Sequence, residues 1–256
     1  MASTNPIFRN FPSDYLPPGD DAPEAGGTTL SGVFFRTATV LLLFACSMTC
    51  SWLEANALQH QDKSRGLPLL VLTLLSALGG AGLVWITLLK NRLSPITAPA
   101  YAVLQGVVVG VLSVGIDIRF PGIAIRAVGL TIVICFCLLT AYRFRFIRVT
   151  ESFRKKLSIA LVGVIAYQAI SFAIGLLWGR TASQASGGVF GIVSSLIILI
   201  IAGMSFISSF DFVVRISGKK LPPFVEWLAA MGLLITLVWL YLEVLDLLSR
   251  VEKESQ

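Results

Sequence analysis

Seven apolar stretches alternate with short polar segments along the chain. They cover residues 32–53, 67–89, 98–116, 122–142, 157–178, 189–210 and 224–248. A hydrocarbon core of ~30 Å needs roughly 20 apolar residues per helix, so each stretch is long enough to cross a membrane. The third is the most diluted by polar and small residues, and Pro95 and Pro99 indicate a short turn before it. The pattern predicts an all-α, polytopic membrane protein with seven transmembrane helices.

Composition supports this class and indicates how the chain is organised. Only 13% of the 256 residues are charged, and the mean hydropathy is +0.83, which excludes an ordinary soluble domain. Residues 1–31 are polar and rich in proline, so we expect a flexible N-terminal tail, followed by a transmembrane domain at 32–249 and a short C-terminal tail at 250–256. The tail lacks the basic start of a cleaved signal peptide, so the first span is expected to stay as an anchor.

The basic residues are distributed unevenly between the two predicted sides of the membrane. Of the 20 Lys and Arg residues, twelve fall on the side of the N-terminus and six on the other, while Arg36 and Arg126 lie inside spans. By the positive-inside rule, the N-terminus is cytoplasmic and the C-terminus outside. We interpret the basic run at 143–156 as a topology signal; the alternative is recruitment of anionic lipid or nucleic acid. We expect the lipid bilayer to be a partner and nucleic acid not to be one.

Few residues suit metal or redox chemistry. His60 is the only histidine, which excludes a multi-histidine site, and the four cysteines lie inside apolar spans without zinc-finger spacing. The chain also lacks recognisable intramembrane protease or nucleotide-binding motifs. We therefore expect neither an enzyme nor a resident cofactor.

Several carboxylates lie where a bilayer should exclude them. Asp211 closes the sixth span, Glu226 lies near the start of the seventh, and Glu243 lies near its end. Ionisable groups inside a span cost about 3 kcal/mol and are usually retained where they face a partner or a wet cavity. Asp211 is the leading candidate, and Arg215 at i+4 is placed to pair with it. Glu226 also suits a helix cap, and Asp246 is expected to be solvated.

Polar and small residues elsewhere in the spans predict contacts between helices. Arg36 either extends to lipid headgroups or faces inward and pairs with an acid of the last two spans. Gly106 and Gly110 have the GxxxG spacing of close helix packing. Tyr167 and Gln168 lie at mid-depth in the fifth span and need partners inside the bundle.

Motifs along most of the chain resemble one family of membrane proteins. The segments are NPIF, GVFFRTA, SPITAPAYAVLQGVVVGVLS, RFPGIAIRAV, YRFRFIRVTESFR, SFDF and VEWLAAMGLLITLVWLYLEVLDLLS. Together they resemble the Bax inhibitor-1 family in its bacterial YccA-like form. The resemblance implies a seven-helix bundle of the bacterial inner membrane, with the last helix surrounded by the others. It also implies a calcium leak controlled by two acids on the sixth and seventh spans, which share a proton or pair with an arginine in the closed state.

The resemblance identifies one of those acids and leaves the other open. Asp211 matches the sixth-span aspartate. For the seventh span, the family motif points to Glu243, whereas depth in the membrane favours Glu226, because Asp211 and Glu226 both lie near the cytoplasmic face. Relatives often carry a glutamate where this chain has Gln105.

These acids suggest a weak and transient calcium site. Two carboxylates close together in a low dielectric resist double ionisation. With the hydroxyls of Ser208 or Ser209, backbone carbonyls and water, Asp211 and Glu226 offer the hard oxygen ligands that calcium prefers, and weak binding lets an ion leave. The sequence predicts a pH-sensitive cation leak; the alternative is a membrane-embedded regulator that binds a stress factor, a membrane protease or another membrane protein through its tail.

Overall fold

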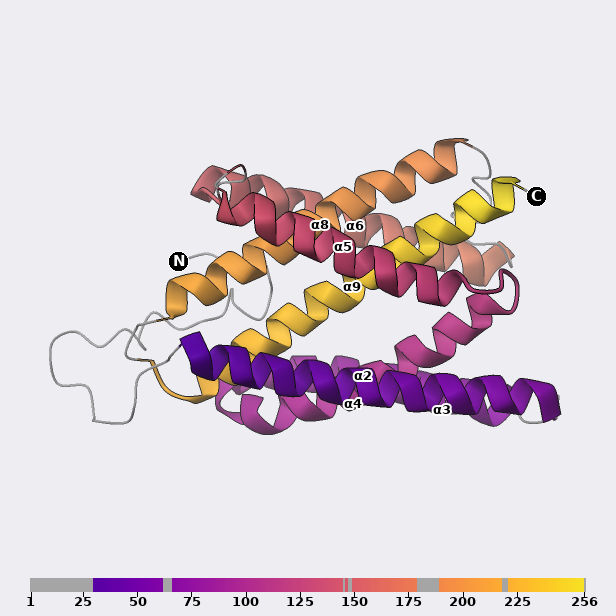
Figure 1. The fold of residues 1–256 in the computed structure, drawn as a ribbon, viewed down its shortest axis with the longest axis horizontal. Coiled ribbons are helices and arrows are strands. Elements are labelled where there is room, and N and C mark those ends of the chain that lie inside the picture. Colours follow the sequence, from indigo (N-terminus) through magenta and orange to yellow (C-terminus); the bar gives the residue numbers. More distant parts are fainter. Residues whose placement is uncertain are drawn as a thin grey trace, which may run out of the picture. The chain divides into compact units, whose positions relative to one another are not determined.

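A computed structural model describes residues 30–61, 66–144, 146, 149–178, 189–217 and 221–255. These residues form helices and a few turns, and the described part of the chain contains no strand (Figure 1). The elements are α2 (Leu30–Gln61), α3 (Gly66–Leu89), the 3-10 turn η3 (Asn91–Leu93), α4 (Ser94–Asp117), α5 (Ile123–Arg143), α6 (Glu151–Trp178), α8 (Val189–Ile216) and α9 (Phe224–Ser255).

Each predicted span corresponds to one α-helix, and the fold class is confirmed. Within the described residues, six helices are long and apolar enough to cross a membrane: α2, α3, α4, α5, α8 and α9. The 28-residue α6 contains the fifth predicted span but is not among these six. Several helices are longer than predicted, and α9 continues through residues 250–255, which the sequence suggested as a tail.

The predicted flexible tail lies outside the described residues, apart from its last two positions. Arg9 lies in this tail. Seven further basic residues used to predict the topology also lie outside the described residues: Lys63, Arg65, Arg145, Arg148, Arg180, Lys219 and Lys220.

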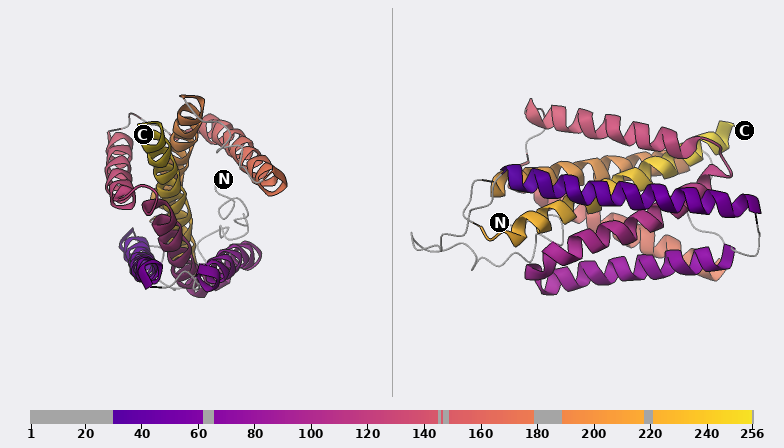
Figure 2. Two further views of the ribbon diagram at one scale, coloured as in Figure 1. Left: turned by 90° about the vertical axis from the view of Figure 1, so that its right-hand side faces the viewer. Right: turned by 60° about the horizontal axis from the view of Figure 1, so that its bottom comes forward.

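The helices divide into two compact units, and α8 and α9 contribute to both. The first unit comprises Met1–Arg119 and Ser209–Val238. In it, α4 packs along α2 and also contacts α3, and Figure 2 shows these helices from two further sides. The GxxxG prediction is confirmed, because a Cβ added to Gly106 would lie 2.7 Å from the Phe44 carbonyl oxygen of α2, and one at Gly110 would lie 2.6 Å from that of Met48. Small residues here let the two backbones approach closely.

The second unit comprises Phe120–Ser208 and Trp239–Gln256. Its helices are α5, α6, most of α8 and the C-terminal half of α9. Gly203 of α8 faces Leu138 of α5, since a Cβ added to the glycine would lie 3.2 Å from a Leu138 methyl group. A long ion pair of 3.7 Å joins Arg126 of α5 to Glu252 of α9.

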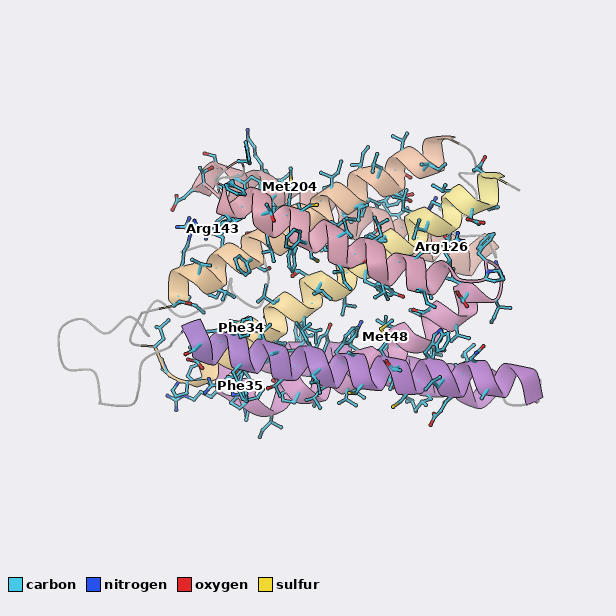
Figure 3. All side chains as sticks on the ribbon, viewed as in Figure 1. Phe34, Phe35, Met48, Arg126, Arg143 and Met204 are labelled. Carbon is cyan, nitrogen blue, oxygen red and sulfur yellow. The ribbon has the colours of Figure 1, made fainter. Side chains whose placement is uncertain are left out.

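Burial differs strongly among the helices. In the most apolar window of α9, 78% of the residues are buried, against 17% in α2 and 11% in α3. The outer helices expose large apolar side chains, and Phe34 and Phe35 point away from α2 (Figure 3). Exposed apolar surface of this extent is expected where lipid, rather than water, surrounds the protein. The burial of α9 agrees with the innermost position predicted for the last helix.

Candidate functional site

Asp211 is a buried carboxylate near the C-terminal end of α8. Its residue is only 5% exposed, and its Oδ2 accepts a hydrogen bond of 2.7 Å from Nε of Arg215, one turn further along the same helix. The side chain of Arg215 is half exposed. Burying a carboxylate without compensation costs several kcal/mol, so this cation helps to hold the charge inside the protein. The i,i+4 spacing in the sequence predicted this pair.

Ser209 lies two residues before Asp211 and is also buried. Its hydroxyl has no hydrogen-bond partner among the described residues. A buried hydroxyl without a partner is unusual, because desolvation costs about 1–3 kcal/mol. It is therefore available as an oxygen ligand, the role suggested for it from the sequence.

Glu226 lies in the first turn of α9 and is tied to α2. Its Oε2 lies 2.6 Å from an Nη of Arg36, and the Glu226 side chain is almost fully buried. The same guanidinium nitrogen donates to the carbonyl oxygen of Pro223, and the guanidinium carbon lies 5.6 Å from the centre of the Trp227 ring. Arg36 therefore contacts α9 through an ion pair, a hydrogen bond and an aromatic face. Of the two interpretations of Arg36, the inward-facing one is observed.

Two further contacts fix the start of α9. The Ser94 hydroxyl of α4 donates a 2.6 Å hydrogen bond to the Phe224 carbonyl oxygen. On α2, Gly32 lies directly against the Glu226 carboxylate, since a Cβ added there would lie 2.5 Å from Oε2. A side chain at this position would displace the carboxylate, so glycine allows the close approach of α2 to Glu226. The first unit thus holds two buried acids, Asp211 and Glu226, each with an arginine.

Glu243, the alternative acid of the last helix, lies in the second unit with partners of its own. The Trp239 indole N–H donates to its Oε1 at 2.9 Å, and the Gln168 amide of α6 donates to the same oxygen at 3.5 Å. This contact provides the partner that the sequence predicted for Gln168. Glu243 itself is 5% exposed.

Asp246, one turn further along α9, is more exposed than Glu243. Its Oδ2 accepts hydrogen bonds of 2.9 Å from Ser195 and 2.7 Å from Nε of Arg250. Its side chain is 44% exposed, so the expectation of a solvated residue holds only in part.

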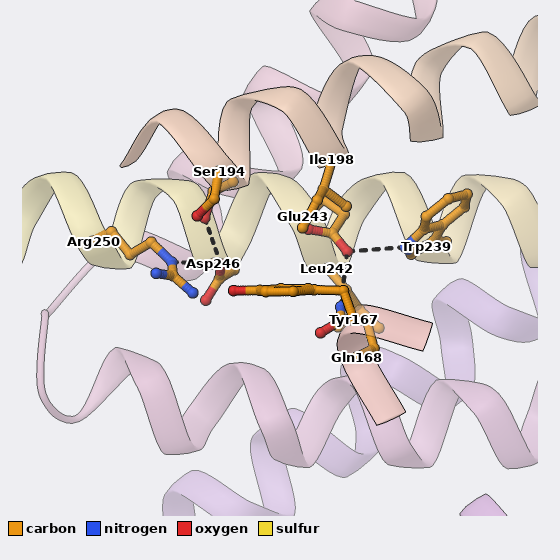
Figure 4. A pocket seen from close by; sticks show the side chains of 10 residues that line it. Tyr167, Gln168, Ser194, Ile198, Trp239, Leu242, Glu243, Asp246 and Arg250 are labelled. Carbon is orange, nitrogen blue, oxygen red and sulfur yellow. Dashed lines mark hydrogen bonds and ion pairs between the residues drawn. The ribbon is translucent and has the colours of Figure 1, made fainter. Parts of the chain in front are cut away.

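Glu243 and Asp246 both line a cavity of about 260 Å³. Its other lining residues come from α6, α8 and α9: Tyr167, Gln168, Ser194, Ser195, Ile198, Trp239, Leu242 and Arg250 (Figure 4). No pattern noted in the sequence predicted this cavity. Two local signals for it are the i,i+4 spacings of Trp239 with Glu243 and of Asp246 with Arg250.

No group of three or more His, Cys, Asp and Glu side chains among the described residues is arranged to hold a metal ion. Serine hydroxyls, backbone carbonyls and water would therefore have to complete any calcium coordination around Asp211 or Glu226. Such a site is weaker than one built from three or more carboxylates.

The described residues form an all-helical fold with long apolar helices, and the last two helices carry buried acids paired with arginines. These features define a multi-pass membrane protein. A family model described as Bax inhibitor 1 like matches residues 5–253, and the chain belongs to this family. No curated protein and no solved structure matches the chain significantly.

Proposed function

We propose that this protein is a pH-sensitive leak pathway for calcium or similar cations, controlled by the buried acids of α8 and α9. The observation that carries the proposal is the pairing of Glu226 with Arg36. It joins the first described helix, α2, to the last, α9, at a side chain that is almost fully buried. Membership of the Bax inhibitor 1-like family agrees with it.

The proposed control follows from the electrostatics of buried ion pairs. While Glu226 is ionised, Arg36 neutralises it and ties α2 to the first turn of α9. Protonation of the carboxylate abolishes the attraction and leaves the arginine charge uncompensated, which favours separation of the two side chains. A lower pH therefore releases the N-terminal end of α9, and the leak increases.

Passage of a cation needs oxygen ligands that bind weakly. Asp211, the Ser209 hydroxyl and Glu226 supply few charges, so an ion that enters can also leave. We propose a bacterial plasma membrane, as the resemblance to the bacterial form of the family implies. The N-terminus would lie in the cytoplasm and the C-terminus outside, from the distribution of basic residues.

Calcium uptake into proteoliposomes tests this function. The wild-type protein is expected to take up calcium faster at acidic than at neutral pH, and Asp211→Asn is expected to reduce the uptake at least tenfold. Glu252→Gln, which changes a partly exposed acid on α9, serves as the matched control and is expected to behave like the wild type. Equal flux through wild type and Asp211→Asn at both pH values would refute the proposal. Absence of flux altogether, with a crosslinked partner that is lost when residues 1–30 are deleted, would support a regulatory role.

A further inference from the structure

We propose that the cavity between α6, α8 and α9 binds a small organic ammonium ion, with its charged nitrogen at Glu243 and its carbon portion against Trp239 and Tyr167. This site lies in the second unit, and the proposal does not depend on calcium flux.

The charged side chains that line the cavity do not balance. Arg250 is engaged by Asp246 at 2.7 Å, whereas no basic side chain among the described residues forms a salt bridge with Glu243. The ionisable groups Glu243, Asp246 and Arg250 therefore give the cavity one negative charge in excess when all are charged. A buried charge normally has a counter-charge, because desolvation is otherwise too costly. A monovalent cation in the cavity would provide it.

The two oxygen atoms of the Glu243 carboxylate differ in their hydrogen bonds. The hydrogen bonds from Trp239 and Gln168 both end on Oε1 of Glu243. Its other carboxylate oxygen accepts no hydrogen bond from the part of the chain that is described, although the residue is 95% buried and lines the cavity. This oxygen is not among the fully buried side-chain atoms without a partner, so it is accessible from the cavity. The N–H groups of an ammonium ion are donors of the required kind.

Aromatic and aliphatic side chains make up part of the remaining lining. Trp239 and Tyr167 bring two aromatic rings to the cavity, and Ile198 and Leu242 add aliphatic surface. In Figure 4 the Tyr167 hydroxyl points toward Asp246, and the ring runs back toward Glu243. The indole N–H edge of Trp239 points at Glu243, so the two aromatic rings offer apolar contact to the carbon portion of an organic cation. They offer nothing comparable in coordination to a hard metal ion, which prefers oxygen.

The cavity is larger than a single inorganic ion needs. At ~30 Å³ per water, the cavity of about 260 Å³ holds roughly eight waters. A bare inorganic ion would leave most of this space to water. A protonated amine with a few carbon atoms would instead place its nitrogen at the carboxylate and fill the apolar remainder.

Isothermal titration calorimetry on the full-length protein in zwitterionic lipid nanodiscs tests the proposal, with n-butylammonium as the probe. We expect saturable binding to wild type, at least tenfold weaker binding to Glu243→Gln, and no binding of n-butanol, which has a similar shape without the charge. Glu252→Gln, a change of an acid on the same helix outside the cavity, is expected to bind like the wild type.

Several outcomes would overturn the proposal. These are an absence of n-butylammonium binding to wild type, unchanged binding to Glu243→Gln, equal binding of n-butanol, and displacement of the probe by calcium at lower concentration than the probe itself. If Glu243→Gln does not fold, Trp239→Leu replaces it, with the same tenfold loss expected. The calcium uptake assay is scored separately, so failure of one proposal leaves the other standing.

Discussion

Arg36 of α2 and Glu226 of α9 form a 2.6 Å ion pair in which the Glu226 side chain is almost fully buried and the Arg36 side chain about three-quarters buried. The same guanidinium reaches the Pro223 carbonyl oxygen and the Trp227 ring. This one side chain therefore fixes the start of the most buried helix to the first described helix.

Replacement of Arg36 by alanine is expected to destabilise the protein by about 3 kcal/mol, because it removes the cation from a buried carboxylate. Chemical denaturation in detergent micelles measures the change. Arg126→Ala is the matched control: it breaks a 3.7 Å pair with Glu252 whose side chains are 66% and 40% exposed, and an exposed pair contributes about 0–1 kcal/mol. Equal losses for the two variants would contradict the importance given to the Arg36 contact.

Gly32→Ala is expected to weaken the same ion pair from the opposite side. The added Cβ would lie 2.5 Å from Oε2 of Glu226, and the carboxylate, at the end of a flexible side chain, would move away from Arg36. We expect a loss of about 1–2 kcal/mol in wild type, in the range of an overpacked core. The loss should disappear in the Arg36→Ala background, because neighbouring changes that act on one interaction are not additive.

A control for Gly32→Ala is Gly129→Ala in α5, where a Cβ would meet nothing within 4 Å. Alanine favours a helix over glycine by up to ~1 kcal/mol, so this variant is expected to be slightly more stable than wild type. If Gly32→Ala were stabilising as well, the proposed displacement of Glu226 would be wrong.

Gly106→Ala is expected to destabilise the contact between α2 and α4 by about 2 kcal/mol, since its Cβ would lie 2.7 Å from a backbone oxygen that cannot move independently. Gly115→Ala, in the same helix, has open space around its Cβ and serves as the control. Thermal unfolding of both variants should show a lower midpoint for Gly106→Ala only. A drop of similar size in both would indicate a general intolerance of α4 to substitution.

The predicted topology can be tested with reporter fusions. A reporter that is active only in the cytoplasm is expected to be active at the N-terminus and inactive after residue 256. The physical reason is the excess of Lys and Arg in the segments assigned to the cytoplasm. Activity at both ends would require an even number of crossings and would show that one of the seven helices does not span.

The sequence predicted the helices well but several of their ends poorly. α4 begins at Ser94, four residues before the predicted start, with Pro95 in its first turn and Pro99 inside it. Proline is tolerated in the first turn, where the N–H would be unpaired, whereas one further along usually marks a helix end. α8 likewise continues to Ile216, beyond Asp211, whose charge suggested the end of the span.

The candidate sites were predicted only where local spacing was sufficient. The Asp211–Arg215 pair follows from one helical turn. The Arg36–Glu226 pair depends on how α2 and α9 come together, so the sequence left two interpretations of Arg36 open. The cavity at Glu243 combines side chains of three helices, and its formation depends on tertiary packing that no local pattern contains. Whether Glu226 or Glu243 acts together with Asp211 stays a prediction.

The burial of α9 has a consequence for biogenesis. This helix carries Glu226, Glu243 and Asp246, yet it leaves the ribosome after the helices that provide Arg36, Gln168 and Ser195. Because an isolated acidic helix inserts poorly into lipid, we expect the earlier helices to insert first and α9 to insert only against them. Deletion of α2 should then leave α9 uninserted, which glycosylation mapping of nascent chains would reveal.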